Sequence, residues 1–173
     1  ILTHFWHCAT YTVGLEKIIN TNNSNIFGLL SFEWNNTEMS QDMQFNWAYN
    51  FGFHNLITQG YTNKGQWLGM GNGYGGQSQY LSFNLFYPQG NTLFFLERVN
   101  PDNNYLFKEA IYDVSTGDTG ALHKRTWNYF KTITSLGIQS SFKVQNFIIS
   151  PEIVYSLITN PLYNELTMYT NWT

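Results

Sequence analysis

Charged residues are scarce in this sequence. They make up 11% of its 173 residues, against about 25% in an average soluble domain. The formal net charge is −3, whereas a protein that binds nucleic acid needs a basic surface to displace the counterions of the phosphates. The composition therefore argues against nucleic acid as a partner.

Cysteine is also scarce, because Cys8 is the single one in the chain. No internal disulfide can form from one thiol. A secreted eukaryotic domain of this size more often carries paired cysteines, while barrels of the bacterial outer membrane need none. The cysteine count is thus compatible with a bacterial outer-membrane protein.

Long apolar runs are missing. No segment approaches the ~18 consecutive apolar residues of a membrane-spanning helix, and the mean hydropathy is −0.29. The chain also begins at Ile1, without an initiator Met, a basic leader or a small-residue cleavage site. We expect no helical membrane span, and a chain that is either a mature product or a piece of something longer.

Aromatic residues are abundant at 18%, and they alternate with polar residues. From Met43 to Phe53 every second residue is large and apolar, and the residues between are mostly Asn, Gln and Gly. A period of two indicates a β-strand with two different faces. A soluble sheet would cover such an apolar face with a second layer, whereas a membrane barrel would turn it to lipid and keep the amides inside.

The same kind of pattern recurs along the chain. Strands are predicted in residues 3–15, 25–35, 43–54, 55–61, 78–87, 92–99, 126–138, 147–157 and 164–172. Polar turns separate them, including 20–24 and the tight turn 88–91. Pro151 is expected to interrupt its strand or to mark an edge or bulge. Residues 100–125 are predicted as one short strand or helix and two loops.

Strand length favours a membrane barrel over a soluble sandwich. Ten residues tilted by about 45° rise roughly 23 Å, close to the ~25 Å apolar band of outer-membrane barrels. Soluble strands most often have only about five or six residues. We therefore predict that residues 1–173 form one all-β segment, nine or ten strands of a larger antiparallel transmembrane β-barrel that is incomplete at the N-terminus. A soluble jelly-roll sandwich that acts as a lectin or a glycoside hydrolase is the alternative.

Two motifs have simple interpretations. Gly71, Gly73 and Gly76 match the spacing of a dinucleotide-binding loop, but a strand follows them where that fold needs a helix, so a glycine-rich loop is expected. His4, His7 and Cys8 are metal-ligand types. In an extended strand, however, His7 points away from the other two, and these stand about 13 Å apart, so no metal site is predicted.

Glu33 and Glu97 are candidates for a pair of glycosidase carboxylates, which need a separation of about 5 to 9 Å. Ion pairing between strands inside a barrel explains the same residues without catalysis. No nucleophile elbow, phosphate-binding loop, or zinc or redox motif occurs. We expect no enzymatic activity, no cofactor and no metal.

One segment combines cations with aromatics: His123, Lys124 and Arg125 precede Trp127. A basic loop beside aromatic rings could hold an acidic polysaccharide, with Arg or Lys meeting its carboxylates. Barrels also place an aromatic girdle at the membrane surface with basic residues just beyond it. Both interpretations stay open from the sequence.

The segment 54–107 carries several short pieces in a characteristic order: QGYTNKGQWLG, GYGGQSQYL, YPQG and LERVNPDNNY. In these pieces the chain resembles the capsule assembly Wzi family of bacterial outer-membrane proteins. The resemblance implies a barrel of about eighteen strands with a small periplasmic helical part. It also implies a lectin-like, non-enzymatic role in attaching capsular polysaccharide. This chain would then be similar to the carboxyl-terminal part alone, and its end, LTMYTNWT, departs from the usual terminal Phe.

The family motif falls on Tyr61, Lys64, Gly65, Gly69, Gly73, Gly76, Arg98 and Asn100. The glycines suit sharp bends or close backbone approach. Lys64 and Arg98 suit an acidic glycan or a counter-charge inside the barrel. The expected partners are therefore an acidic or capsular polysaccharide, outer-membrane lipid, and the missing N-terminal barrel portion or a partner chain. A channel barrel of another family is a further alternative.

Overall fold

The computed structural model describes residues 9–38, 62–64, 66–68, 75–101, 130–161 and 168–172. All regular structure in these residues is β, and every strand pair is antiparallel. Within the same residues there is no helix long and apolar enough to cross a membrane. The predicted all-β, antiparallel class is confirmed.

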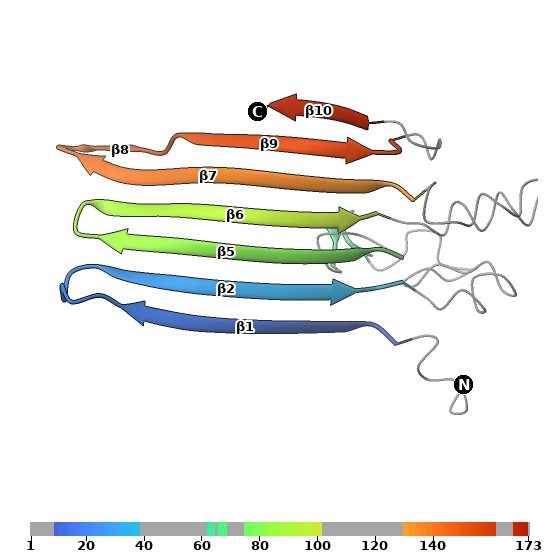
Figure 1. The fold of residues 1–173 in the computed structure, drawn as a ribbon, viewed down its shortest axis with the longest axis horizontal. Helices are drawn as coiled ribbons and strands as arrows, with labels where there is room; N and C mark the ends of the chain where they lie inside the picture. The colour runs from blue at the N-terminus through green and yellow to red at the C-terminus, as the bar shows by residue number, and fades with distance from the viewer. Residues whose placement is uncertain are drawn as a thin grey trace, which may run out of the picture.

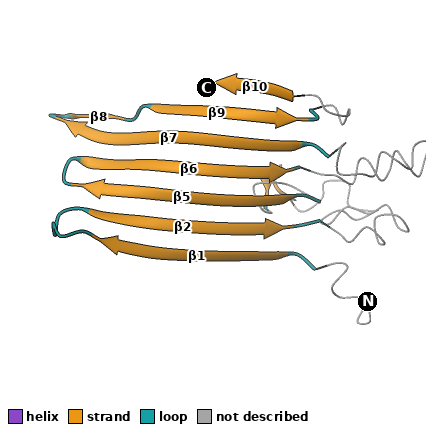
Figure 2. Ribbon diagram, in the orientation of Figure 1, coloured by secondary structure: helices purple, strands orange, loops and turns teal. Residues whose placement is uncertain are grey.

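One large sheet dominates the molecule (Figures 1 and 2). Its strands lie in the order β1-β2-β5-β6-β7-β9-β10, and β8 pairs with the end of β7. The strands are β1 (Tyr11–Asn20), β2 (Phe27–Asn36), β5 (Gln77–Tyr87), β6 (Gly90–Asn100), β7 (Thr132–Val144), β8 (Phe147–Ile149), β9 (Glu152–Thr159) and β10 (Met168–Trp172). A separate hairpin joins β3 (Thr62–Asn63) to β4 (Gln66–Trp67).

Most predicted strands within the described residues are confirmed. β2, β5 and β6 lie within two residues of the predicted bounds, and Pro88 and Gln89 form the predicted tight turn between β5 and β6. β1 continues past the predicted end to Asn20, and β7 starts later than predicted, at Thr132, and ends later, at Val144. The predicted strands 43–54 and 55–61 lie outside the described residues.

Pro151 interrupts the strand in which it stands, as predicted. It separates β8 from β9, yet its carbonyl still accepts a hydrogen bond from the Ser140 N–H at 3.0 Å. On β7 two residues separate Gln139, which pairs with Glu152 of β9, from Phe142, which pairs with Ile149 of β8. Two residues also separate Ile149 from Glu152, so β8 and β9 keep one register along β7. Proline has no N–H to donate, and the break falls beyond the stretch of β9 that β10 covers.

The pleat divides the sheet into two chemically different faces, because successive residues point to opposite sides and paired residues share a side. The apolar face is defined by two adjacent cross-strand rows in the middle of the sheet. The first row is Leu15, Phe32, Leu81, Leu96, Leu136, Tyr155 and Trp172, and the second is Lys17, Leu30, Phe83, Phe94, Ile138 and Ile153. Every member except Lys17 is aliphatic or aromatic.

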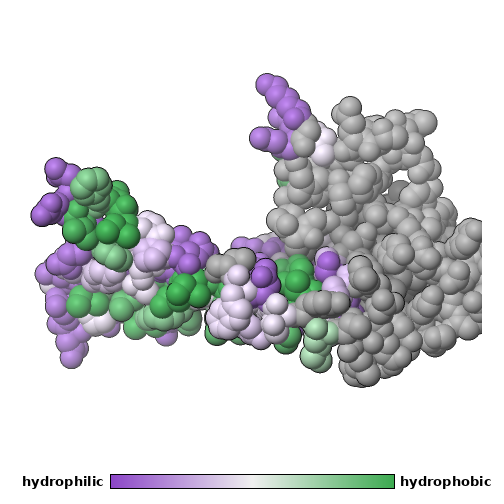
Figure 3. All heavy atoms as spheres, turned by 90° about the horizontal axis from the view of Figure 1, so that it is seen from above, coloured by the Kyte–Doolittle hydropathy of each residue, from purple (hydrophilic) through white to green (hydrophobic). Residues whose placement is uncertain are grey.

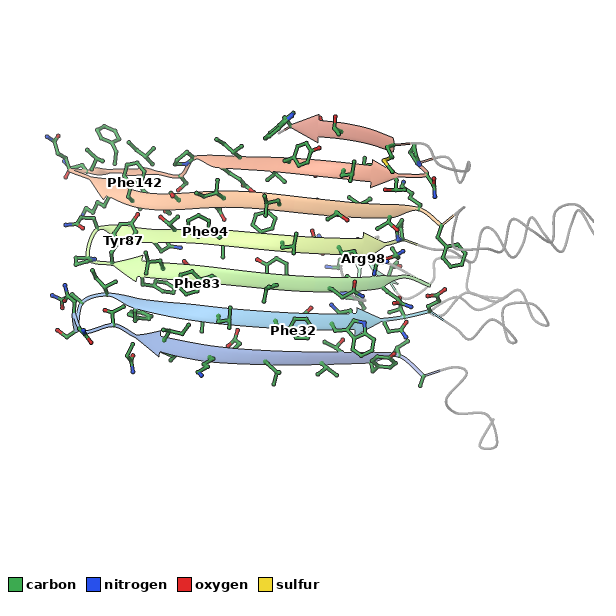
Figure 4. The ribbon with its side chains drawn as sticks, in the orientation of Figure 1. Phe32, Phe83, Tyr87, Phe94, Arg98 and Phe142 are labelled. Carbon is green, nitrogen blue, oxygen red and sulfur yellow. The ribbon has the colours of Figure 1, made fainter. Side chains whose placement is uncertain are left out.

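These apolar side chains are not covered in the part of the chain that the structure describes. Leu15 is 69% exposed, Leu136 61% and Ile153 58%. Figure 3 looks along the plane of the sheet and shows hydrophobic residues lining its lower margin. Phe32, Phe83 and Phe94 mark this face in Figure 4. The sheet therefore presents a continuous apolar band.

The polar face is defined by the two rows on the opposite side at the same height. One is Gly14, Glu33, Tyr80, Glu97, Ser135, Ser156 and Asn171, and the other is Glu16, Ser31, Ser82, Phe95, Gly137 and Val154. Small and polar residues dominate both rows. At this height the sheet is apolar on one side and small and polar on the other, as in a sheet whose two faces meet different environments. The next row toward the hairpin turns adds Ile18, Leu29 and Leu93 to the polar side.

Short and long connections lie at opposite ends of the strands (Figure 1). The strand ends joined by the turns 21–26, 88–89 and 145–146 are called the hairpin edge. The opposite strand ends, from which the connections 37–76, 101–131 and 160–167 leave, are called the loop edge. The hairpin edge is closely tied, since the Lys143 N–H donates to the carbonyl of Gln89 at 2.8 Å. Long insertions are therefore confined to one edge.

Aromatic rings cover glycines on neighbouring strands. The Phe83 ring occupies the space beside Gly28, where an added Cβ would lie 2.6 Å from it, and the Phe95 ring likewise lies over Gly137. Covering a strand glycine with a cross-strand aromatic ring supplies packing that glycine itself lacks. These contacts fix the direction of both rings.

Gly90 offers a test of the close packing at the hairpin edge. A Cβ there would overlap the carbonyl oxygen of Ser141 and lie 2.7 Å from the Cα of Phe142, and backbone atoms cannot move aside cheaply. We expect Gly90→Ala to lower the free energy of unfolding by about 1 to 3 kcal/mol, measured by equilibrium unfolding in urea.

Gly14→Ala is the matched control. A Cβ at Gly14 would meet only the carbonyl oxygen of Phe32, at an ordinary 3.7 Å, so a change within about 0.5 kcal/mol is expected. Equal losses in the two variants would contradict the pairing of Gly90 with β7.

Candidate functional site

Four of the residues predicted to bind glycan or to carry the family motif lie in the described part of the chain: Lys64, Gly76, Arg98 and Asn100. Asn100 is buried at the end of β6, where its Nδ2 donates to Thr132 Oγ1 at 3.0 Å. The others lie outside it: Tyr61, Gly65, Gly69, Gly73, His123, Lys124, Arg125 and Trp127. The row from Met43 to Phe53 and the group His4, His7 and Cys8 also lie outside the described residues.

Lys64 occupies the turn of the β3–β4 hairpin. Its φ is 51°, in the left-handed region that non-glycine residues seldom adopt, and its side chain is exposed. The turn belongs to the connection 37–76, which starts and ends at the loop edge. Lys64 is thus a cation on a tight turn outside the large sheet.

Gly76 closes the base of the same connection. The Thr37 N–H donates to the Gly76 carbonyl at 2.9 Å, and the Gly76 N–H donates to Thr37 Oγ1 at 3.1 Å. Thr37 Oγ1 also donates to that carbonyl at 3.0 Å. Gly75, next to it, has φ 66°, a conformation that glycine adopts without steric cost. These bonds extend the β2–β5 ladder beyond the strand ends.

Arg98 lies on the same side as the apolar face, one row nearer to the loop edge. Its row includes Trp34 and Gln79, and Nη1 donates to Oε1 of Gln79 at 3.0 Å. Its neighbour Glu97 points to the opposite side, as expected for adjacent strand residues. Arg98 is labelled in Figure 4 near the loop end of β6. It therefore lies at the end of the apolar band rather than beside Glu97.

Glu33 and Glu97 lie in one row of the polar face, with Tyr80 between them. Two strand spacings separate their Cα atoms, about 10 Å. Neither forms an ion pair with a residue that the structure describes, so the expected ion pairing between strands is not seen there. The strand register thus places in one row two carboxylates whose separation in space the sequence does not predict.

A hydrogen-bond network orients Glu33. Its Oε1 accepts from Asn35 Nδ2 at 2.5 Å, the same amide donates to Ser78 Oγ at 3.2 Å, and Asn35 Oδ1 accepts from Thr12 Oγ1 at 2.6 Å. Asn35 is 8% exposed and Ser78 is 7% exposed. Buried polar groups of this kind are costly unless they are paired. Asn35 therefore ties β1, β2 and β5 together beneath the carboxylate.

Two aromatic rings stand beside the carboxylates. The centroids of Tyr80 and Phe95 are 6.1 Å apart, and the ring planes differ by 26°. Phe95 pairs across the strands with the small residues Ser82 and Gly137, and Tyr80 pairs with Glu33 and Glu97. Ser31 and Ser135 occupy the next positions of the same two rows. Sequence reasoning missed this pair, because the strand 78–87 predicts which side Tyr80 occupies but not which strands lie next to it.

The described residues contain no group of three or more His, Cys, Asp or Glu side chains arranged to hold a metal ion. Comparison of the chain with known proteins found no matching family model, no matching curated protein and no matching solved structure. The resemblance to the capsule assembly Wzi family therefore stays a prediction from short motifs.

Asn35 provides a test of the network. Asn35→Ala removes one hydrogen-bond partner each of Thr12, Glu33 and Ser78, and Ser78 is buried. We expect a loss of about 1 to 3 kcal/mol in the free energy of unfolding, measured in urea. Asn22→Ala, in the exposed turn between β1 and β2, should change it by less than about 0.5 kcal/mol. A similar small change in both variants would show that the network contributes nothing to stability.

Proposed function

We propose that the chain forms part of the wall of a bacterial outer-membrane β-barrel, is not an enzyme, and helps to attach or assemble capsular polysaccharide at the cell surface. The observation that carries the proposal is the two-sided sheet: the apolar face turns toward lipid and the polar face toward the barrel interior. The glycan part of the proposal rests on the motif resemblance and on the local cluster of Lys124 and Arg125 beside Trp127.

Leaving the apolar face exposed to water would be costly. Removing one large aliphatic or aromatic side chain from water is worth about 1.5 to 3 kcal/mol. Two adjacent rows of such side chains exceed the apolar patches that monomeric soluble proteins expose. The other described sheet, the β3–β4 hairpin, has two residues in each strand and is too small to cover these rows as the second layer of a sandwich. Lipid can surround these apolar side chains without a second protein layer.

The height of the apolar band suits an outer membrane. On β5, the distance from the mixed row of Gln79 and Arg98, which bounds the band at the loop edge, to Tyr87 at the hairpin edge is about 27 Å along the strand. A tilt of about 40° reduces this to roughly 20 Å, near the ~25 Å band of outer-membrane barrels. Amphipathic aromatics stand at both ends: Tyr11 packs edge-on against Trp34 at 5.1 Å, and the Tyr87 hydroxyl shares a 3.3 Å hydrogen bond with Thr92. Such girdles mark the two membrane surfaces.

Lys17 is the charged exception in the band, and its position makes it tolerable. It lies three residues before the end of β1, about 10 Å from the hairpin edge. A lysine can lay its methylenes along apolar surface while its ammonium reaches the membrane surface. Lys17 therefore fits a lipid-facing wall near the hairpin side.

The two edges of the sheet suit the two sides of the outer membrane. Outer-membrane barrels have short periplasmic turns and longer extracellular loops. The hairpin edge is then periplasmic, and the loop edge faces the cell exterior. Lys64, His123, Lys124, Arg125 and Trp127 all belong to connections at the loop edge, which is where an acidic capsular polysaccharide would meet them.

Barrel closure requires further strands. β1 and β10 form the two ends of the strand order, and all ten residues of β1 are exposed. An open edge of this length invites pairing with another strand. We propose that the N-terminal portion of the barrel, or a partner chain, completes the wall at β1 and β10.

The lipid-facing assignment is tested by two arginine substitutions in β7. Leu136→Arg puts a charge in the middle of the apolar face, and we expect it to reduce the folding free energy in lipid vesicles by about 2 to 4 kcal/mol. Gln139→Arg puts the same charge on the polar side and should cost much less. Equal costs would contradict the assignment of faces, as would a protein that stays monodisperse without detergent.

The glycan role is tested at the loop edge. We expect Lys124→Glu with Arg125→Glu to weaken binding of an acidic capsular polysaccharide by at least about tenfold, because two attractive charges become repulsive. Binding of the full-length protein is measured by surface plasmon resonance in detergent. Lys143→Glu, a charge reversal at the hairpin edge, is the control and should have little effect. Unchanged binding in the double variant would refute the role of this segment.

A further inference from the structure

The polar face holds a group of side chains that the loop-edge role does not use. We infer that Tyr80 and Phe95, with Glu33 and Glu97, form a binding site for a non-acidic sugar unit. The inference rests on the proposed function, because it assigns a sugar class to the interior of the proposed barrel.

The rings rise above a floor of small residues. Ser82 is 6% exposed, Ser135 is 9% exposed, and Gly137 has no side chain. The Phe95 ring is held over Gly137, and Tyr80 lies nearly parallel to it at 6.1 Å. An aromatic face carries negative charge density that attracts the polarised C–H groups of a sugar ring. Large rings among small neighbours are therefore available to a ligand on this face.

The carboxylates supply hydrogen-bond acceptors on either side of the Tyr80 ring. Glu33 and Glu97 occupy the strands next to Tyr80, in the same row. Glu33 is held by Asn35 through Oε1 alone, and no described residue bonds its second oxygen. An ionised carboxylate accepts strong hydrogen bonds from hydroxyl or ammonium donors. About 10 Å separates the two Cα atoms, with Tyr80 between them, so the two carboxylates flank a sugar ring that lies on the Tyr80 side chain.

Charge decides which sugar class fits. The two rows of the polar face contain Glu16, Glu33 and Glu97 but no Lys or Arg, so a uronic acid would meet like charge, which disfavours its binding. A neutral hexose can donate its hydroxyls to the carboxylates, and an amino sugar can add an ion pair. The interior site therefore differs from the basic segments at the loop edge.

Binding suits this arrangement better than hydrolysis. Glu33 is exposed, whereas the general acid of a glycosidase lies in an apolar pocket. Tyr80 also stands between the two carboxylates, in the place that the scissile bond would occupy. The four side chains are those of a sugar-binding site.

The test uses the full-length protein in detergent micelles and isothermal titration with three hexasaccharides. These are maltohexaose, which is neutral, the glucosamine hexamer, which is cationic, and hexagalacturonate, which is anionic. We expect Tyr80→Ala to weaken binding of the first two by about tenfold or more, while Tyr80→Phe, which keeps the ring, stays within about twofold. Glu97→Gln should weaken the glucosamine hexamer more than maltohexaose, because it removes the charge and keeps the shape.

Leu81→Ala is the matched control, since Leu81 follows Tyr80 but points to the apolar face. It should leave binding of all three probes unchanged. Glu97→Gln keeps the inference testable if Tyr80→Ala fails to fold. The inference is overturned if neither non-acidic probe binds, if Tyr80→Ala and Glu97→Gln bind as the parent does, or if hexagalacturonate binding depends on Tyr80.

Different results would refute the interior sugar site and the proposed function. Hexagalacturonate binding that is lost on charge reversal of Lys124 and Arg125 but unaffected by Tyr80→Ala, with no binding of the other probes, would keep the loop-edge role and remove the interior site. A protein that remains soluble and monodisperse without detergent would remove the barrel, whatever Tyr80→Ala does.

Discussion

The continuous hydrogen-bonded ladder is the constraint on which the rest of the structure depends. Because it runs without a slip from β1 to β10, each row of paired residues stays on one side of the sheet. A slip of one residue in a single strand would exchange its two faces. Shifting β5, for example, would put Ser82 among the leucines and Leu81 among the serines. The chemical difference between the faces is therefore a property of the register as much as of the composition.

The same ladder explains why proline and charged residues are tolerated within strands. Pro151 loses its N–H, but its carbonyl still bonds Ser140, so the register survives the break. Glu16 and Lys17 interrupt the hydrophobic alternation of β1, yet the backbone pairing with Ser31 and Leu30 continues. Backbone pairing is indifferent to side-chain polarity, and this is why β1 runs to Asn20 although the alternation predicts an end at Leu15.

The sequence predicts local features better than distant ones. The bounds of β5 and β6 follow from alternation on both sides of a two-residue turn, which is local information. The start of β7 does not: the carbonyls of Phe130 and Lys131 accept hydrogen bonds from the side chains of Asn160 and Asn100, and these donors come from distant parts of the chain. Alternation alone therefore places this strand too early in the chain, at 126–138, whereas β7 is Thr132–Val144.

The candidate interior site likewise combines features that are local in the sequence with one that depends on distant parts of the chain. The parity of Tyr80 within its strand is visible in the sequence, and so is the parity of Glu33 and Glu97 within theirs. Their meeting in one row depends on β2 pairing with β5 across the connection 37–76, which no local pattern specifies. Topology, rather than any motif, thus brings the carboxylates to either side of an aromatic ring. A search for sugar-binding sites in sheets of this kind has to follow cross-strand rows, because residues that act together there are remote in the chain.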